Sequence, residues 1–346
     1  MIMITVLITG CSMHSYDLIT ELRRNYENED IKVVGINCAE DALLRKGVDA
    51  GYIVPRITEP DYIPTVLDIC KKENVDVILP FITAELPIMA DNKKFFEDEG
   101  IKVSVTSKSS LELVGEKTSL YGLFGSSMPK QSIVHTINNV DRFACLVGYP
   151  EKNICCKLPN RCGGLGFAVI DEEKGKDLTI MNKFGMNRYI TLSMLKEYVQ
   201  YSLDKGEKVI LQEYAEGVDY SMCVLADNGK VTHALGFEAD LMAYGSAMFA
   251  KISFNTKACE IAKEIVEKSG LDGNACFDFI ITPDGEAVLL ECNPRVNATL
   301  PFIARAGLNL PYLRCKQLLG FDILKYDIDI NYDLKMSKNY ESEYYI

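Results

Sequence analysis

The chain has 346 residues, of which 48% are hydrophobic and 25% charged, and its formal net charge is −12. This is a globular composition with room for two or three domains. The acidic balance, without any lysine or arginine run longer than two residues, argues against nucleic acid as a partner. A small anionic ligand stays compatible with it, because local lysines can outweigh the overall charge.

The twelve cysteines include no C-x-x-C pair, and the histidines (His14, His135 and His233) are far apart in sequence, which argues against a zinc site. We expect reduced, mostly buried cysteines in a cytoplasmic protein.

The apolar start, MIMITVLITG, lacks the basic segment of a signal peptide. No apolar run approaches the roughly 18 residues of a membrane helix, so we predict no membrane partner.

Strands and helices alternate in the first part of the chain. Near-continuous apolar strands that alternate with helices indicate a parallel sheet covered on both faces. We predict a Rossmann-like domain over residues 1–110, with strands at 2–8, 31–37, 75–81 and 101–105 and helices at 16–26, 61–74 and 85–98. Its first turn, GCSMHS, has no G-x-G-x-x-G, so a dinucleotide site is not expected.

From Leu111 the pattern changes to a mixture of helices and antiparallel hairpins, an α+β region. We predict helices at 111–124 and 257–270, strands at 154–159 and 209–217, and hairpins at 219–237 and 274–293. The Asn228-Gly229 pair between apolar runs is a strong hairpin signal. We expect one two-lobed unit over residues 111–320, with a small lobe at about 125–215, and a polar C-terminal tail over 321–346 that is a surface strand or partly disordered.

The hairpin at 274–293 predicts a pair of facing carboxylates. With a two-residue loop at Asp284-Gly285, Asp278 faces Glu291, with Cβ atoms about 5 Å apart. The apolar residues of the hairpin then share the other face: Phe277, Phe279, Ile281, Leu290 and Cys292. Two like charges so close destabilise a sheet unless a cation compensates them, and Mg²⁺ takes carboxylate and amide oxygens. Asn293 follows on the same face and Arg295 can grip a phosphate or carboxylate. The alternative is a solvated polar face.

Two other stretches are compatible with a nucleotide. Lys157 ends an apolar strand and is followed by Gly163, Gly164 and Gly166. Glycines let backbone N–H groups approach a phosphate, and a lysine adds a point charge. This is not the G-x-x-x-x-G-K-[ST] loop, and a flexible turn is the alternative. In LQEYAEGVDY, the backbone of residues 213–215 can read an adenine edge and Asp219 can accept from ribose hydroxyls, or the stretch is simply a polar strand end.

Taken in order, Lys117, Lys157 with its glycines, Q-E-Y-A-E-G-V-D-Y, F-D-F and E-C-N-P-R resemble the ATP-grasp superfamily over roughly residues 1–320. The resemblance is greatest to one half of the carbamoyl phosphate synthase large subunit and to related carboxylate–amine ligases. It implies a Rossmann-like domain followed by a two-lobed ATP-grasp module. It also implies that such an enzyme phosphorylates a carboxylate and lets an amine or a thiol displace the phosphate, forming ADP.

The resemblance implies a role for each matching residue. Lys117 and Lys157 would bind ATP phosphates, and residues 163–166 would close over them. An adenosine pocket would be formed by Gln212, Glu213, Tyr214, Ala215 and Asp219. Two Mg²⁺ ions, or Mn²⁺, would be held by Asp278 (where close relatives carry Glu), Glu291 and Asn293. Arg295 would lie beside the transferred phosphoryl group, and the catalytic residues would be Arg295 and Lys157.

The chain also departs from its relatives, because it is one half-length unit and cannot be a complete carbamoyl phosphate synthase. After the Asn-Gly hairpin, where many relatives are rich in arginine, it carries Glu238 and Asp240. An acidic patch there would suit an amine-bearing substrate, and a solvated loop is the alternative. His14, Thr83 and Glu85 follow the first and third strands, where open α/β sheets bind ligands, and are candidates for lining the acceptor pocket.

The resemblance leaves three hypotheses open. The first is an ATP-dependent ligase for small-molecule carboxylate and amine substrates. The second is a carboxyphosphate-forming or carbamoyl-phosphate-type activity that works with a partner subunit. The third is an ATP-binding module without catalysis, against which the intact set of charged residues argues. Dimers are common in this family, so a homodimer is compatible with the chain.

Overall fold

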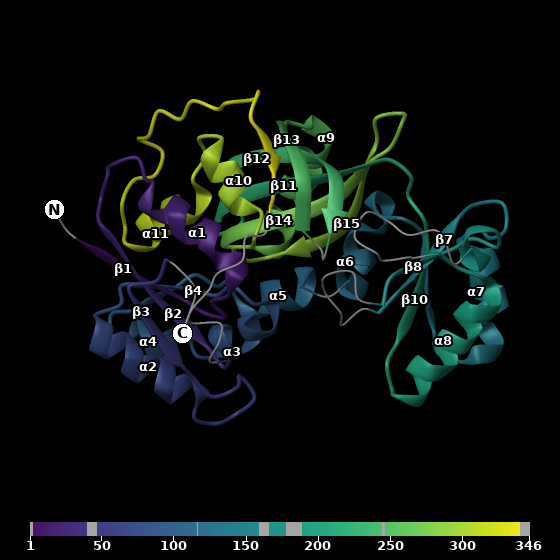
Figure 1. Cartoon of the computed structure of the whole chain (residues 1–346), viewed down its shortest axis with the longest axis horizontal. Helices are drawn as coiled ribbons and strands as arrows, with labels where there is room; N and C mark the ends of the chain where they lie inside the picture. Colours follow the sequence, from purple (N-terminus) through teal and green to yellow (C-terminus); the bar gives the residue numbers. More distant parts are fainter. Residues whose placement is uncertain are drawn as a thin grey trace.

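The computed structural model describes residues 3–39, 47–115, 117–158, 166–177, 189–243 and 246–339. Two five-stranded sheets and one six-stranded sheet organise this part of the chain (Figure 1). Within these ranges no helix has both the length and the apolar character needed to cross a bilayer.

The N-terminal sheet is parallel, with strand order β3-β2-β1-β4-β5. Its strands are β1 (Ile4–Ile8), β2 (Ile31–Asn37), β3 (Ala50–Ile53), β4 (Val77–Leu79) and β5 (Lys102–Val103). Val6 packs with α1 (Tyr16–Arg23) and Leu7 with α2 (Tyr62–Glu73), because neighbouring residues of a strand point to opposite faces. Both faces are therefore buried, as the continuous apolar strands predict.

Two features of this sheet differ from the predicted elements. Strand β3 has an alternating, half-exposed pattern and was not predicted. The helix predicted at 85–98 is two helices, α3 (Leu86–Asp91) and α4 (Lys93–Glu97), which meet at Asn92. The backbone of Asn92 leaves the helical region, with φ −107° and ψ 8°.

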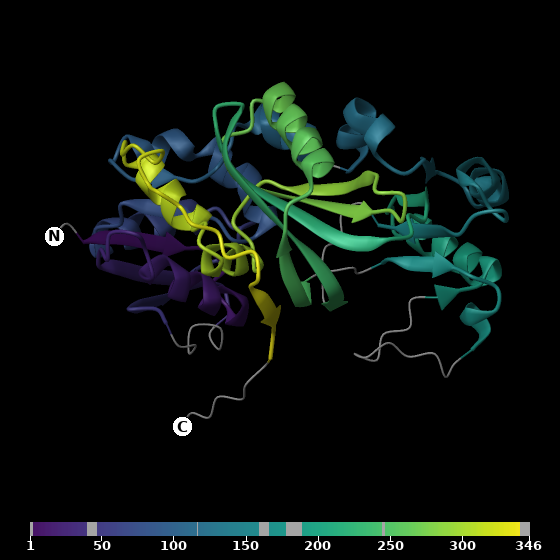
Figure 2. The same ribbon diagram turned by 90° about the horizontal axis from the view of Figure 1, so that it is seen from above.

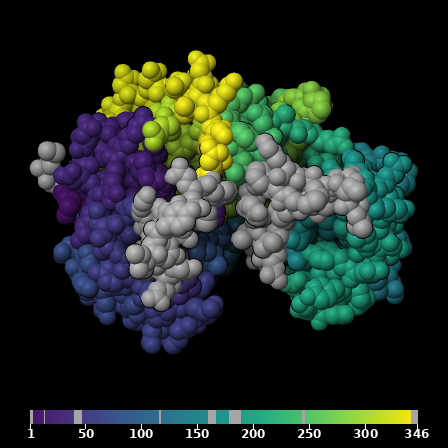
Figure 3. Space-filling model, in the orientation of Figure 1, coloured from purple at the N-terminus to yellow at the C-terminus, as the bar shows by residue number. Residues whose placement is uncertain are grey.

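The second sheet forms the small lobe, with strand order β6-β10-β7-β8-β9. Its strands are β6 (Gln131–Val134), β7 (Ile154–Lys157), β8 (Ala168–Ile170), β9 (Tyr189–Ile190) and β10 (Val209–Glu213). Helices α7 (Val140–Val147) and α8 (Leu192–Asp204), which were not predicted, cover one face through a shared apolar core. The lobe projects away from the other sheets (Figure 1), and the surface is indented beside it (Figure 3).

The third sheet has the order β15-β14-β11-β12-β13-β16. Its strands are β11 (Val218–Asp227), β12 (Lys230–Ala243), β13 (Ser246–Ser253), β14 (Gly273–Ile281), β15 (Ala287–Asn293) and β16 (Lys335–Ser337). Helix α9 (Thr256–Ser269) covers one face (Figure 2), together with α5 (Lys108–Val114) and α6 (Lys117–Phe124). On the other face, α10 (Leu300–Arg305) and α11 (Leu310–Leu318) join this sheet to the N-terminal one.

The Asn228-Gly229 hairpin is confirmed. Both residues have positive φ, 45° and 85°, as the two-residue turn requires, and Asp227 pairs with Lys230. In the polar tail, β16 pairs with β13, which gives that edge of the large sheet a partner strand.

The hairpin of β14 and β15 reaches its predicted pairing by a different route. Its loop has three residues rather than two, because Thr282 and Glu286 pair through their backbones and Gly285 takes a positive φ of 82°. That loop alone would place Leu290 opposite Asp278. A β-bulge between Asp278 and Phe279 restores the register, so Asp278 faces Glu291. Leu290 is the extra residue and does not join the buried face that Phe277, Phe279 and Cys292 share, so that part of the prediction was wrong.

Candidate active site

The facing carboxylates lie at one end of the large sheet and share their hydrogen-bond partners. Asn293 Nδ2 donates to Asp278 Oδ2 at 3.1 Å and to Glu291 Oε1 at 3.4 Å. Ser221, across from Asp278 on β11, donates its hydroxyl to Asp278 Oδ1 at 2.6 Å. Four side chains from three strands thus form one polar row on the face opposite α9.

Two lysines from other elements approach this row. Lys117, the first residue of α6, pairs with Glu291 Oε2 at 3.0 Å. Lys157 ends β7 of the small lobe and lies close enough for the charges of Glu291 and Lys117 to act on it. The Glu291 side chain is 37% exposed and that of Lys117 18%, so a ligand can reach the pair.

Burial and mutual charge perturb these groups. Burial and the charge of Glu291 raise the pKa of Asp278, although the hydrogen bond from Ser221 lowers it in part. Burial would also raise the pKa of Glu291, but the charges of Lys117 and Lys157 hold it below its ordinary value. Burial and the charge of Lys117 lower the pKa of Lys157. Such opposite shifts within one set of side chains are typical of functional sites.

The donor set suits a hard divalent cation. Asp278 and Glu291 supply carboxylate oxygens, and Asn293 supplies an amide oxygen once its side chain turns by half a rotation, since an amide can present either end. Among the described residues there is no group of three or more His, Cys, Asp or Glu arranged to hold a metal ion. A metal here would therefore depend on Asn293 and on ligand oxygens to complete its coordination, as Mg²⁺ commonly does.

The predicted adenosine-binding stretch links the two lobes. Glu213 ion-pairs with Lys152, and the Tyr214 N–H donates to the Asn153 carbonyl at 2.9 Å. Recognition of a base would therefore fall to the Ala215 N–H and to carbonyl groups rather than to the Glu213 carboxylate.

Two other predicted adenosine-pocket residues belong to strands on either side of this linker. Gln212 is buried at the end of β10. It pairs with Cys155, so it shares with Lys157 the sheet face that α7 and α8 leave uncovered. Asp219 lies two residues before Ser221, at the exposed start of β11.

Of the predicted glycine loop, Gly163 and Gly164 lie outside the described residues. Gly166 has a φ of 75°, and a Cβ there would lie 2.8 Å from both Leu158 Cγ and the Tyr198 hydroxyl. Packing and backbone conformation therefore favour glycine at this position, independently of the predicted contact with a phosphate.

Arg295 lies where the large sheet meets the N-terminal sheet. Its Nε donates to Thr83 Oγ1 at 2.7 Å and its Nη1 to the Val296 carbonyl at 3.0 Å. It follows Asn293 by two residues, and Asn293 contacts Asp278 and Glu291. Burial raises the pKa of Asp278, and the charge of Arg295 opposes this rise. Thr83 was a candidate for the acceptor pocket and is thereby brought to the site.

The other acceptor-pocket candidates have different surroundings. Burial and the charge of Lys338 lower the pKa of His14. Glu238, from the acidic stretch after the Asn-Gly hairpin, pairs with Tyr220, whereas its neighbour Phe237 pairs with Ser221. Glu238 therefore points to the opposite face from Asp278. There Lys251 neutralises it at 2.7 Å. An acidic patch built on Glu238 is therefore excluded from the carboxylate side.

Glu85 is buried at 4% exposure and accepts hydrogen bonds from the hydroxyls of Thr9 and of Tyr62, the latter at 3.1 Å. Burial raises the pKa of Glu85, and this effect exceeds the lowering by the two hydrogen bonds. A carboxyl whose folded pKa exceeds its unfolded pKa stabilises the fold at low pH, and this contribution is lost as pH rises through the folded pKa.

The expected result is that Glu85→Gln gains stability relative to the wild type as pH rises from about 4 to about 8, starting near the unfolded pKa of roughly 4.3. Thermal unfolding of both proteins across this range measures the difference in melting temperature. A difference that stays constant with pH contradicts the assignment of Glu85 as a buried, titrating carboxyl.

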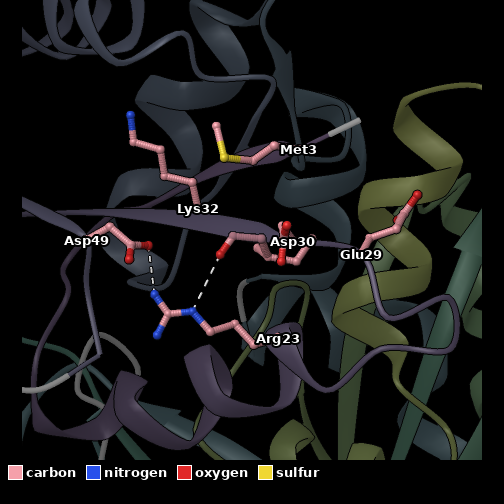
Figure 4. Close-up of a pocket in the computed structure, with 7 residues that line it drawn as sticks. Met3, Arg23, Glu29, Asp30, Lys32 and Asp49 are labelled. Carbon is pink, nitrogen blue, oxygen red and sulfur yellow. Dashed lines mark hydrogen bonds and ion pairs between the residues drawn. The ribbon is translucent and has the colours of Figure 1, made fainter. Parts of the chain in front are cut away.

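A separate hollow of about 410 Å³ lies at the amino ends of the N-terminal strands (Figure 4). Its lining is Met3, Arg23, Glu29, Asp30, Ile31, Lys32 and Asp49. Arg23 pairs with Asp49 at 2.7 Å, and Lys32 pairs with Glu73 at 2.8 Å. The hollow is at the opposite strand ends from Thr83, and its cations already have acidic partners, so it is not part of the active site.

The sequence analysis did not identify Ser221, Lys152 or Asn153. Ser221 meets Asp278 because β11 pairs with β14, and no short turn joins these strands to reveal their register. Lys152 and Asn153 precede β7 and meet residues 213–216 only because β7 pairs with β10. Such long-range pairings leave no local signal in one sequence.

Two family models match separate parts of the chain. Residues 6–104 match the model described as "PylC-like, N-terminal domain". Residues 205–340 match the model described as "ATP-grasp in the biosynthetic pathway with Ter operon".

Curated relatives include the arginine-specific carbamoyl phosphate synthase large chain of Bacillus subtilis, 21% identical over 279 residues, which are 79% of this chain and 25% of that one. The chain thus spans about a quarter of the length of that relative.

Solved structures share the fold. A biotin carboxylase in complex with βγ-ATP from Campylobacter jejuni aligns with a TM-score of 0.66 at 15% identity, over 94% of this chain and 73% of that one. An L-amino acid ligase from Bacillus licheniformis aligns with a TM-score of 0.63 at 13% identity, over 92% and 74%. Residues 205–340 thus match an ATP-grasp model, and the chain resembles part of the carbamoyl phosphate synthase large chain in sequence and biotin carboxylase in fold.

Proposed function

We propose that the protein is an ATP-dependent ligase that phosphorylates a small-molecule carboxylate and then joins the acyl group to an amine, releasing ADP and phosphate. The observation that carries the proposal is the convergence of Lys117, Lys157 and the Asp278–Glu291 pair from three separate parts of the fold. Cations and metal-binding oxygens in one accessible place are what transfer of a γ-phosphoryl group requires.

In this proposal each element of the fold has one task. The linker at Gln212–Ala215 holds the base and Asp219 the ribose. Lys117 and Lys157 neutralise the phosphates, and Gly163, Gly164 and Gly166 belong to the loop that covers them. Arg295 stabilises charge that develops on the acyl phosphate. Because both reactants are aligned by binding alone, no covalent protein nucleophile is needed.

Asp278, Glu291 and Asn293 would hold Mg²⁺, or Mn²⁺ in its place, with two ions sharing Glu291. A bound divalent ion neutralises charge on the transferring phosphate oxygens. The raised pKa of Asp278 beside Glu291 supports the assignment. It indicates that the positive charges of the protein do not fully compensate the negative charge of the carboxylate pair, so that a cation would stabilise it.

A second candidate is phosphorylation of bicarbonate to carboxyphosphate together with a partner subunit. It is favoured by the similarity to carbamoyl phosphate synthase large chains, of which this chain spans only a quarter. Self-association as a homodimer is compatible with either candidate.

The test is ADP formation by the purified protein with Mg²⁺ and a panel of single amino acids, amino-acid pairs and bicarbonate. We expect ADP release that depends on one amine and one carboxylate and that stops when EDTA removes the metal. Release with bicarbonate alone favours the second candidate. Tight ATP binding without release under any of these conditions identifies a non-catalytic module or a missing partner and contradicts the ligase proposal.

A further inference from the structure

The hydrogen bond between Arg295 and Thr83 crosses from the large sheet to the N-terminal sheet. It joins residues 212 positions apart, with Arg295 Nε as the donor and Thr83 Oγ1 as the acceptor at 2.7 Å. The arginine side chain has several staggered rotamers, whereas its guanidinium group is planar and rigid. Each hydrogen bond to the guanidinium therefore restricts the rotamers that the side chain can adopt.

The turn that carries Thr83 is held from inside the N-terminal sheet. Residues Thr83–Glu85 form a short 3-10 helix that follows the end of β4 after three intervening residues. Glu85 at its end is buried and accepts from Thr9 and Tyr62, residues of two other elements. The Thr9 hydroxyl in turn accepts from the Phe81 N–H at 3.2 Å. The exposed Thr83 hydroxyl therefore stands on a turn whose base is anchored by buried hydrogen bonds.

Close packing also fixes the start of this turn. Ile82 lies against Gly10, the residue that begins the first turn of the domain with a φ of 55°, and a Cβ on Gly10 would lie 2.2 Å from Ile82 Cδ1. A side chain there would displace Ile82 and would take a φ that residues other than glycine rarely adopt. The two loops at the carboxyl ends of β1 and β4 therefore support each other, which limits movement of Thr83.

Arg295 also donates a hydrogen bond to the carbonyl of the adjacent Val296 at 3.0 Å. That contact is local and moves with its own strand end. The contact with Thr83 relates the guanidinium to a different domain. Arg295 is two residues from Asn293, whose side chain contacts Asp278 and Glu291, so a small change in its direction moves a positive charge relative to the carboxylate row.

We propose that Thr83 is a positioning residue: its hydroxyl, held by the Glu85–Thr9–Tyr62 network, orients Arg295 toward the transferred phosphoryl group. The N-terminal domain would thus contribute to the phosphoryl-transfer step itself. The inference rests on the proposed function of Arg295, and the experiment below separates the failure of one from the failure of the other.

The test uses MgADP with and without aluminium fluoride, which mimics a transferring phosphoryl group and needs no knowledge of the acceptor. Isothermal titration with the full chain measures both affinities. We expect Thr83→Val to weaken binding of MgADP with aluminium fluoride about three- to tenfold, the range for one lost hydrogen bond, while binding of MgADP alone is unchanged. Thr83→Ser, which keeps the hydroxyl, should bind as the wild type does.

Two controls exclude a merely structural effect. Thr58→Val, at an exposed threonine of the same domain, should leave both affinities unchanged. In an Arg295→Ala background, Thr83→Val should cause no further loss, because two residues that act through one contact are not additive.

If the wild type binds MgADP more tightly with aluminium fluoride and Thr83→Val does so equally, the inference about Thr83 is wrong and the proposed function stands. An independent loss from Thr83→Val in the Arg295→Ala background also overturns it. A wild type that gains nothing from aluminium fluoride contradicts the phosphoryl-transfer site itself, and with it both proposals.

Discussion

Glu291→Gln is expected to lower ATP turnover by more than about 100-fold, since even residues that only support a metal ligand cost 10–100-fold when they are lost. The amide keeps the shape of the side chain but removes the charge that faces Lys117 at 3.0 Å and the proposed ions. The measurement is ADP formation with saturating Mg²⁺ and the substrates that support turnover in the wild type.

A matched control is Glu286→Gln, at the residue that closes the loop of the same hairpin. Glu286 is exposed and pairs with Lys257 at the surface, and such surface pairs contribute little to stability. It should retain turnover close to that of the wild type. Near-normal turnover in Glu291→Gln would refute the metal assignment, because the proposed bridging carboxylate would then be dispensable.

Lys117→Met is expected to change two affinities in opposite directions. Without nucleotide, the Lys117 ammonium pairs with Glu291 at 3.0 Å, where it competes with a divalent cation for the same carboxylate. Removing it should increase the affinity for Mn²⁺ in the absence of nucleotide by at least about tenfold, given that charges a few ångströms apart interact by several kcal/mol near a protein surface. It should also weaken ATP binding, because the phosphates lose one of their cations.

Electron paramagnetic resonance of free Mn²⁺ measures the first change, and titration with a fluorescent ATP analogue measures the second. A linkage between the two sites follows, since in the wild type the nucleotide draws Lys117 away from Glu291 and so favours the metal. Lys257→Met, at a surface lysine, is the control. Unchanged Mn²⁺ affinity in Lys117→Met would show that the pair does not restrain the metal site.

The sequence could predict what depends on local patterns. The strand at 31–37, the helix that ends at Gly270 and the Asn228-Gly229 turn follow from apolar periodicity, a left-handed helix stop and a two-residue hairpin signal. The facing of Asp278 and Glu291 was also predicted correctly. That success was partly fortuitous, because the assumed loop was one residue too short and the bulge at Leu290 compensated for it.

What depends on contacts between distant segments could not be predicted. The hydrogen bonds of Ser221 with Asp278 and of Thr83 with Arg295 join strands and domains that no short turn connects. The orientation of Glu238 depends on the register of β11 with β12 in the middle of a wide sheet, and a shift of one residue there reverses the face of a side chain. The sequence therefore revealed the acidic residues but not the face of the sheet on which Glu238 lies.

The central claim is that Asp278, Glu291 and Asn293 hold divalent ions against the terminal phosphates of ATP. Crystals grown with Mn²⁺ and a non-hydrolysable ATP analogue test it most directly, through the anomalous scattering of manganese. The account predicts manganese peaks about 2.1–2.3 Å from oxygens of Glu291 and of Asp278 or Asn293, near the hard-cation distances of known sites, with the γ-phosphate between them and Lys157. Nucleotide bound elsewhere, or manganese with no ligand from these three side chains, would contradict it.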